Sequence, residues 1–306
     1  MTTIPELEQQ TTVEIKKANK RKYFLEGLSA KVFLGCALLS VVSLALIIAF
    51  VFYKGSYPFV AEGYSFIDFL FGTEWVPSED KFGILPMIVA SLLATLGALI
   101  IGVPVGLFTA IFLAEIAPKR MAKIVSPAIQ LLAGIPSVLY GVFGLAIIVP
   151  FLQNNLGLAR GQSLLAVILV LAIMMLPTIV TVAETAIRAV PKTYREGSLA
   201  LGASQIETIF KVVVPAAKSG IMAAIVLGLG RAIGETMAVI LVAGNSLIIP
   251  TSLTDSVRPL TTNIALEMGY ASGTHQGMLF ATGIVLFSFI LILNFVLAKI
   301  SSRGAN

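Results

Sequence analysis

The chain has 306 residues, of which 57% are apolar and only 12% are charged, and its mean hydropathy is +0.96. Soluble domains carry about 25% charged residues, so this composition excludes a soluble globular protein and indicates an integral membrane protein. The single Cys36 excludes disulfides within the chain, and the single His275 leaves no histidine cluster for a metal. We therefore expect neither a metal nor a cofactor.

Six apolar segments are long enough to cross a bilayer, since a spanning helix needs roughly 20 apolar residues. The first follows a polar tail and has no small-residue cleavage signature after it, so we interpret it as an anchor rather than a signal peptide. The pattern predicts an all-α integral membrane protein with six transmembrane helices. The segments are Val32–Tyr53, Ile84–Ala114, Ile124–Leu152, Ser163–Ala183, Ile221–Ile249 and Gly277–Ala298.

The distribution of lysine and arginine predicts the orientation of these helices. With the N-terminus inside, sixteen of these residues lie in inner segments, and only Lys54, Lys81, Arg160 and Arg258 lie in outer ones. An excess of positive charge on the cytoplasmic side is typical of membrane proteins, so we expect both termini in the cytoplasm. The net charge of +5 then reflects topology rather than nucleic-acid binding.

The predicted organisation along the chain follows from the spans and their orientation. The order is a cytoplasmic N-terminal tail (1–31), a first transmembrane anchor (32–53), an extracytoplasmic loop (54–83), a membrane core (84–298) that includes a polar cytoplasmic loop (191–218), and a cytoplasmic C-terminus (299–306).

Two of the predicted spans contain residues that interrupt helices. Gly102, Pro104 and Gly106 lie in the second span, and Gly134 and Pro136 lie in the third. Proline removes a backbone donor and kinks a helix, so the freed carbonyls must face protein or water rather than lipid. Such breaks are more frequent in helices that line a transport pathway, although kinked packing helices are also common.

The polar loop before the fifth span carries signals for two short helices. Thr193 and Glu196 have the spacing of a capping box, and Ser204 and Glu207 repeat it. Gly202 lies between the two pairs, where a helix end commonly needs a positive φ. These residues predict an ordered helix–turn–helix and, by themselves, nothing more specific.

The same loop resembles the EAA loop of ABC-importer permeases, whose pattern is E-A-A, three residues, G, nine residues, I-x-L-P. Glu196, Gly202 and Pro215 match the acid, the glycine and the proline in register. The two alanines are replaced by Gly197 and Ser198, which are also small. In that family the loop docks in a groove of a cytoplasmic ATPase and transmits its closure, so the resemblance implies this role here.

A charged pair lies inside the fifth predicted span. Arg231 is ten residues past Ile221, about 15 Å along a helix, and hence near the middle of the bilayer. An isolated charge there costs at least ~2.5–3.5 kcal/mol, and Glu235, four residues on, can neutralise it. The pair is either a structural ion pair or a site where Arg231 meets a crossing anion, because a guanidinium suits oxyanions.

Three segments resemble the phosphate-transporter permeases among the ABC importers. They are LAGIPSVLYGVFGL (132–145), GLGRAIGETMAVILVAGN (228–245) and PLTTNIALEMG (259–269), and the second is closer to the PstC-type subunit than to its PstA-type partner. The resemblance runs from about residue 84 to the C-terminus. It implies the type I ABC-importer permease (MetI-like) fold and inorganic phosphate as the substrate.

The resemblance also favours a substrate pathway over a structural ion pair for Arg231 and Glu235. Ser137 and Tyr140 follow the break in the third span and are further candidates for lining that pathway. The implied partners are a second permease (PstA-type), a cytoplasmic ATPase dimer (PstB-type) and an extracytoplasmic phosphate-binding protein (PstS-type). The implied location is the bacterial cytoplasmic (inner) membrane.

We expect no enzymatic activity from the chain itself. Lys218 and Ser219 resemble the end of a P-loop, but the positions before them lack its glycines, so ATP hydrolysis is expected on a partner subunit. Two alternatives stay open. One is a permease for another oxyanion, such as sulfate, molybdate or phosphonate, and the other is a secondary transporter with broken helices and an intramembrane ion pair.

Overall fold

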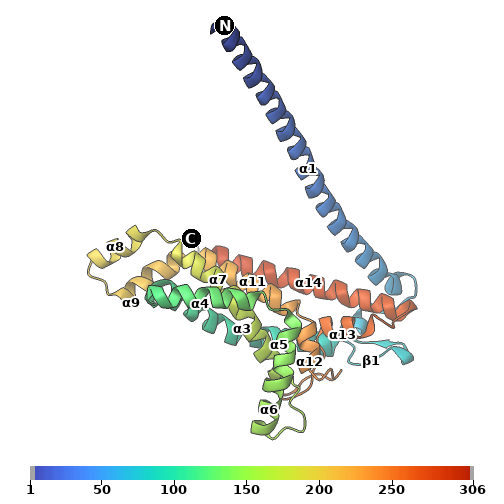
Figure 1. The fold of residues 1–306 in the computed structure, drawn as a ribbon. Coiled ribbons are helices and arrows are strands. Elements are labelled where there is room, and N and C mark those ends of the chain that lie inside the picture. The colour runs from blue at the N-terminus through green and yellow to red at the C-terminus, as the bar shows by residue number, and fades with distance from the viewer. Residues whose placement is uncertain (1–3, 304–306) are drawn as a thin grey trace. The chain divides into compact units, whose positions relative to one another are not determined.

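The computed structural model of the chain describes the backbone of residues 4–303 and the side chains of residues 26–296 and of Lys299. The chain divides into two compact units, Met1–Tyr53 and Lys54–Asn306. The described part of the first unit is a single helix, the beginning of α1 (Ile4–Val60) (Figure 1). The second unit holds all the other elements.

Helix α1 extends the predicted anchor in both directions. Its part that is long and apolar enough to cross a membrane is Glu26–Val60, whereas the prediction was 32–53. The described residues of the predicted N-terminal tail, from Ile4 onward, are also helical. Residues 1–3 of that tail, and residues 304–306 of the predicted C-terminus, lie outside the described residues.

The second unit is built around α7 (Leu164–Arg188), an almost wholly apolar helix that is buried over most of its length. Helices α3 (Leu85–Ile111) and α11 (Lys218–Ile233) pack along it. They can come close because a glycine on each, Gly106 and Gly228, faces Ile179 of α7. A Cβ added at either glycine would lie 2.8 Å from that isoleucine side chain.

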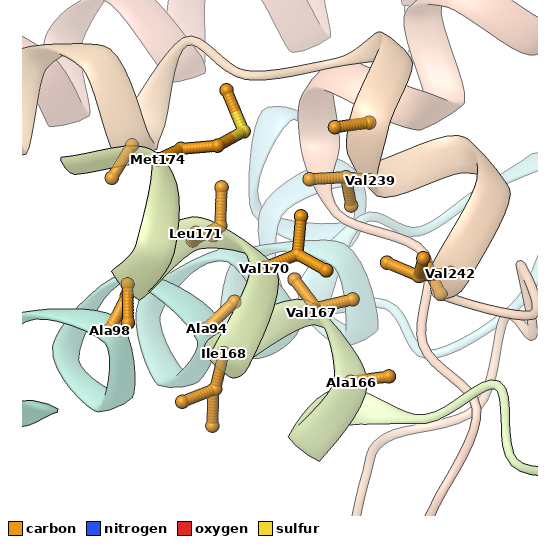
Figure 2. Close-up of a cluster of buried hydrophobic side chains, with 14 of the residues drawn as sticks. Ala94, Ala98, Ala166, Val167, Ile168, Val170, Leu171, Met174, Val239 and Val242 are labelled. Carbon is orange, nitrogen blue, oxygen red and sulfur yellow. The ribbon is translucent and has the colours of Figure 1, made fainter. Parts of the chain in front are cut away.

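Figure 2 shows how the N-terminal half of α7 forms the core. Val167, Val170 and Leu171 of α7 lie between small side chains of α3, such as Ala94, and Val239 of α12 (Met237–Val242). Small residues facing branched ones let the helices interdigitate at the density of a protein interior. This core fixes the positions of two interrupted helices, which are described below.

Of the remaining elements, α14 is long and runs along the bundle, and most of the others are short (Figure 1). In Figure 1, α8 and α9 lie at one end of it, and β1 and α13 lie at the other. The elements are α2 (Phe66–Phe71), the antiparallel strands β1 (Trp75–Val76) and β2 (Lys81–Phe82), η1 (Pro77–Glu79), η2 (Phe112–Ile116), α4 (Lys119–Ala133), α5 (Ser137–Phe143), η3 (Gly144–Ile148), α6 (Val149–Leu156), α8 (Lys192–Ala200), α9 (Gln205–Thr208), η4 (Ile209–Val213), α10 (Val214–Ala216), α13 (Leu260–Glu267) and α14 (Gly273–Arg303).

In the described part of the chain, five helices are long and apolar enough to cross a membrane, and a bent pair makes a sixth candidate. This agrees with the predicted number of spans. The bent pair consists of Gln205–Ala216 and Lys218–Ile233, which meet at 70°. The five helices are Glu26–Val60, Leu85–Ile116, Ser137–Leu156, Leu164–Arg188 and Gly273–Val296.

Three predicted details of these spans are wrong. The third span begins at Ser137 rather than at Ile124, because α4 is a separate helix that buries none of its residues. The fifth is not continuous, since α11 ends at Ile233. The break expected around Pro104 is absent, because α3 runs unbroken to Ile111 and its glycines serve close packing on α7.

Candidate functional site

The first break lies between α4 and α5, at the predicted Gly134–Pro136 position. The last carbonyls of a helix have no partner within it, and in a membrane they cannot be left bare. Here the Tyr140 hydroxyl donates to the Leu132 carbonyl at 2.7 Å. Tyr140 is 8% exposed, whereas Ser137 is half-buried and has no hydrogen bond among the described residues. Tyr140 thus stabilises the break itself.

The second break lies between α11 and α12. The Glu235 carboxylate accepts from the Ala238 N–H at 3.0 Å, which caps α12, and the Glu235 carbonyl accepts from the Thr261 hydroxyl at 3.0 Å. Of the two alternatives for this pair, the structural ion pair between Arg231 and Glu235 is not formed among the described residues. Because α11 ends at Ile233, the two side chains do not share a helix face, and the carboxylate is engaged with backbone.

Arg231 lies in the last turn of α11 and is half-buried. Within the described residues its guanidinium has no ion pair and no hydrogen bond. Arg231 lies at the second break and Tyr140 at the first, and the helices that follow the two breaks, α5 and α12, pack against each other. A charge without a partner in a membrane segment is expensive, so Arg231 is a candidate functional residue.

The segments that follow the two breaks, α5 and α12, pack against each other. A cavity of about 10 Å³ lies beside Glu235 and is lined in part by Ser91, Thr95 and Thr261. This is the lower limit for a single water molecule, so the enclosed space cannot hold an oxyanion. The guanidinium N–H groups of Arg231 can donate to a ligand, whereas the Glu235 carboxylate already accepts from the Ala238 N–H.

The polar loop at 191–218 has one of its two predicted capping boxes. Helix α8 begins directly after Pro191, so Thr193 lies inside it and the Thr193–Glu196 box is wrong. The box at Ser204 and Glu207 is confirmed, with reciprocal hydrogen bonds of 3.3 Å and 3.1 Å. The Ser204 N–H, together with the Lys211 ammonium, lowers the pKa of Glu207 to about 2.

Buried aliphatic residues anchor the second half of this loop to the bundle. Ile209 and Val213 are buried in a cluster with the ends of α3 and α7. Ile206 and Phe210, which share a helical spacing with these two residues, are instead 56% and 46% exposed. The loop therefore presents apolar side chains outward. We call Leu199, Leu201, Ile206 and Phe210 the exposed apolar residues of the loop.

The residues that match the EAA pattern lie in α8, in the turn that follows it and, for Pro215, in α10. Gly202 has φ +86°, as predicted, and Ser198 shares a 2.9 Å hydrogen bond with Thr208 across the turn. Glu196 is exposed and has no hydrogen bond or ion pair among the described residues. Gly197 and Pro215 are exposed as well. The turn is thus ordered from within and leaves its acid free.

Comparison with known proteins identifies the family. Residues 102–304 match the family model described as binding-protein-dependent transport system inner membrane component. The chain belongs to this family. The permease is 42% identical over 272 residues to the probable ABC transporter permease protein YqgH of Bacillus subtilis (strain 168), covering 86% of this chain and 88% of that protein. It is 38% identical over 238 residues to the phosphate transport system permease protein PstC of Pasteurella multocida (strain Pm70), covering 72% and 74%.

Solved structures agree on the fold. The permease resembles a chain of a bacterial ABC transporter that imports the acidic polysaccharide alginate, with a TM-score of 0.64, 16% identity, and coverage of 95% of this chain and 99% of that one. It also resembles a chain of the inward-facing MetNI methionine ABC transporter, with a TM-score of 0.55, 20% identity, and coverage of 72% and 94%. The predicted all-α, MetI-like permease fold is confirmed.

Membership of this family shows where the protein is located and what kind of transporter it belongs to. The permease is a multi-pass protein of the bacterial inner membrane and a PstC-type component of an ABC transporter that includes an ATPase and a binding protein. It belongs to a family of transport components rather than of catalytic enzymes. The orientation of the two termini stays a prediction.

Two buried charge clusters of the permease were not predicted. In one, Arg195 of α8 forms an ion pair with Glu115 of η2. In the other, the Glu267 carboxylate accepts from Trp75 at 2.8 Å and Arg258 at 2.7 Å and lies 2.8 Å from His275. Their partners are as much as 192 residues apart in sequence. Residue spacing carries no signal for such pairs.

Proposed function

We propose that this chain is the PstC-type permease subunit of an ATP-driven importer of inorganic phosphate. The relatives named phosphate transport system permease protein PstC, at 38% and 35% identity, support this substrate. The proposed partners are a PstA-type permease, a PstB-type ATPase dimer and a PstS-type phosphate-binding protein. Both termini would then face the cytoplasm, as the sixteen inner basic residues indicate.

The half-buried guanidinium of Arg231, which has no partner among the described residues, is the observation that carries the substrate pathway. A guanidinium offers a planar fork of donors that matches two oxygens of a phosphate. The Tyr140 hydroxyl and the Glu235 carboxylate are both occupied by backbone groups, so their role is to hold the two breaks that position Arg231. Ser137 stays a candidate for the lining of the path.

The 191–218 loop supplies the proposed coupling to ATP hydrolysis on the partner. Exposed apolar side chains are the usual anchors of protein interfaces, and the loop presents four of them beside the free carboxylate of Glu196. Gly197, Ser198 and Gly202 shape the turn that displays them, and Pro215 closes the loop. Because the sequence holds no complete P-loop, hydrolysis is assigned to the ATPase subunit.

The test is uptake of radiolabelled phosphate into proteoliposomes that contain the permease with its partner permease and ATPase, plus binding protein outside. We expect uptake to require ATP and to resist excess sulfate. Arg231→Gln should lower it about 10-fold or more, because it removes a charged hydrogen bond to the anion. Glu235→Gln is the matched control, since its amide oxygen can still accept from Ala238.

Each other outcome has a definite meaning. Uptake without ATP would contradict the importer. ATP-dependent uptake that sulfate abolishes would replace phosphate by another oxyanion. If Arg231→Gln and Glu235→Gln were equally active, the substrate pathway would not pass Arg231.

A further inference from the structure

Arg195 makes an unusually complete set of contacts for a residue on a polar loop. Its Nε donates to both oxygens of the Glu115 carboxylate, at 3.2 and 3.0 Å, and its Nη2 contacts the same carboxylate. Nη1 donates to the Val190 carbonyl at 2.6 Å, and Nη2 donates to the Ile187 carbonyl at 3.0 Å. One side chain thus joins three elements, namely α8, the end of α7 and η2.

The burial of this pair separates it from an ordinary surface salt bridge. The Arg195 and Glu115 side chains are 22% and 10% exposed, whereas the Lys211–Glu207 pair on the same loop is 74% and 49% exposed. Exposed pairs contribute little because water and salt screen them. A half-buried, two-pronged arginine pair that also binds carbonyls holds a defined geometry, which a lysine cannot reproduce.

Helix α8 packs on η4 and α9 within the loop but buries none of its own side chains, so its direct attachment to η2 and to the end of α7 depends on hydrogen bonds. None of its residues, Lys192–Ala200, is buried. Among the described residues, the side-chain hydrogen bonds of α8 to other elements are those of Arg195 and the bond from Ser198 to Thr208, which stays within the loop. Arg195 is therefore the side chain that links α8 by hydrogen bonds to η2 and to the end of α7.

The element that receives this contact is itself attached to the core. Glu115 lies in η2, which continues α3 directly, and α3 packs along α7. A separate arginine, Arg188, donates to the Leu113 carbonyl of η2 at 2.6 Å and to Glu184 at 2.9 Å. The contact of η2 with α7 through Arg188 thus does not involve Arg195.

We propose that Arg195 is a positioning residue that locks α8 to η2, so that a displacement of α8 by the ATPase moves the end of α3 instead of being absorbed by the loop. This inference rests on the proposed coupling role of the loop and assigns to two further residues, Arg195 and Glu115, the transfer of motion into the membrane core.

The test uses the whole transporter in lipid nanodiscs and has two readouts. Hydrogen exchange of peptides that cover 112–118 and 192–200 is compared with and without ATP plus vanadate. We expect both peptides to respond in the unmodified protein, and only 192–200 to respond in Arg195→Ala. In parallel, the ATP hydrolysed per phosphate taken up should rise about 2- to 30-fold in Arg195→Ala.

Three variants make the result specific. Lys192→Gln removes a positive charge from the same helix and should behave as the unmodified protein does. Arg195→Lys keeps the charge but not the fork, so it should fall between the unmodified protein and Arg195→Ala. Glu115→Gln weakens the same contact from the other side, and it decides the question if Arg195→Ala does not assemble.

The inference is overturned if 112–118 still responds to nucleotide in both Arg195→Ala and Glu115→Gln, or if it does not respond in the unmodified protein. A merely structural role would lower stability and leave the ratio of ATP to phosphate unchanged. Because hydrogen exchange requires no substrate, a transporter that takes up no phosphate would contradict the proposed function and still decide the role of Arg195.

Discussion

Gly141 of α5 lies directly against Ala238 of α12, so that a Cβ added to the glycine would stand 2.7 Å from the Ala238 Cα and 3.0 Å from its carbonyl oxygen. The two helices are the segments that follow the two breaks, and they begin next to Tyr140 and Glu235. This close approach sets how the two breaks lie relative to each other, and hence where Arg231 is presented.

Gly141→Ala should therefore separate α5 from α12. The clash is with backbone, which cannot rotate away, and overpacking of this kind costs about 1–3 kcal/mol. We expect a lower thermal midpoint of the purified permease and reduced phosphate uptake. Gly27→Ala, at a position with nothing within 4 Å of the added Cβ, is the matched control. Equal midpoints for the two variants would mean that the contact is not tight in solution.

Two glycines of the 191–218 loop should respond to alanine in opposite directions. Gly202 has φ +86°, where a side chain costs about 1–2 kcal/mol, so Gly202→Ala should loosen the turn. Gly197 lies inside α8 with open space around it, so Gly197→Ala should stabilise that helix by about 0.5–1 kcal/mol. Limited proteolysis of the loop would report both effects. Faster cleavage of both variants would contradict this prediction.

The exposed apolar residues of the loop should govern assembly rather than folding. Leu201 is 91% exposed, so Leu201→Glu should leave the thermal midpoint unchanged. Loss of an interface anchor typically costs more than about 1 kcal/mol, so binding of the purified ATPase should weaken about tenfold, as titration would measure. Undiminished binding by a Leu201→Glu, Ile206→Glu double variant would exclude this surface as the docking site.

The Glu267 cluster should be a major source of stability at its end of the bundle. The Glu267 and Arg258 side chains are 8% and 16% exposed, and removal of one partner of a buried pair costs about 3–5 kcal/mol. Glu267→Ala should therefore lower the thermal midpoint strongly. Glu74→Ala breaks a pair with Lys81 that is largely exposed, and it should leave the midpoint unchanged. Similar midpoints for the two variants would count against a structural role for the cluster.

The capping box of the loop should weaken in acid. The pKa of Glu207 is about 2 in the folded loop, below the ordinary glutamate value of about 4.3. A depressed pKa means that the stabilisation is complete above about pH 4.3 and is lost as the pH falls toward 2. Titration of the Glu207 carboxyl by carbon-13 NMR would measure this directly, and Lys211→Gln should raise the value. A midpoint near 4.3 in the unmodified protein would contradict the reciprocal hydrogen bonds.

Features that depend on a few neighbouring residues were predictable from the sequence. The Ser204–Glu207 box, the positive φ of Gly202 and the break at Gly134–Pro136 all arise from interactions within four residues of chain. The number of spans was equally accessible, since it depends on the length of apolar segments and on little else. The predicted capping box at Thr193 was wrong, because the helix begins at Lys192 and the threonine lies inside it.

Burial on the loop could not be read from periodicity. Ile206, Ile209, Phe210 and Val213 share a helical spacing, yet only Ile209 and Val213 are buried. The π-helical segment η4 interrupts the α-helical register, and the bundle covers only one side of the loop. Which residues face outward was thus decided by packing against α3 and α7.

The sequence by itself was enough to predict a membrane protein with several spans, an ordered polar loop and an arginine inside a span. These features were predictable because hydrophobicity, helix caps and helix breakers act locally. Only the tertiary structure decided the partners of the charges. It ended α11 at Ile233, which separated Arg231 from Glu235 and turned Glu235 to the backbone, and it joined Arg195 to Glu115 across 80 residues of sequence. The physical reason is distance: an ion pair requires contact in space, and contact between distant segments arises only when the bundle packs.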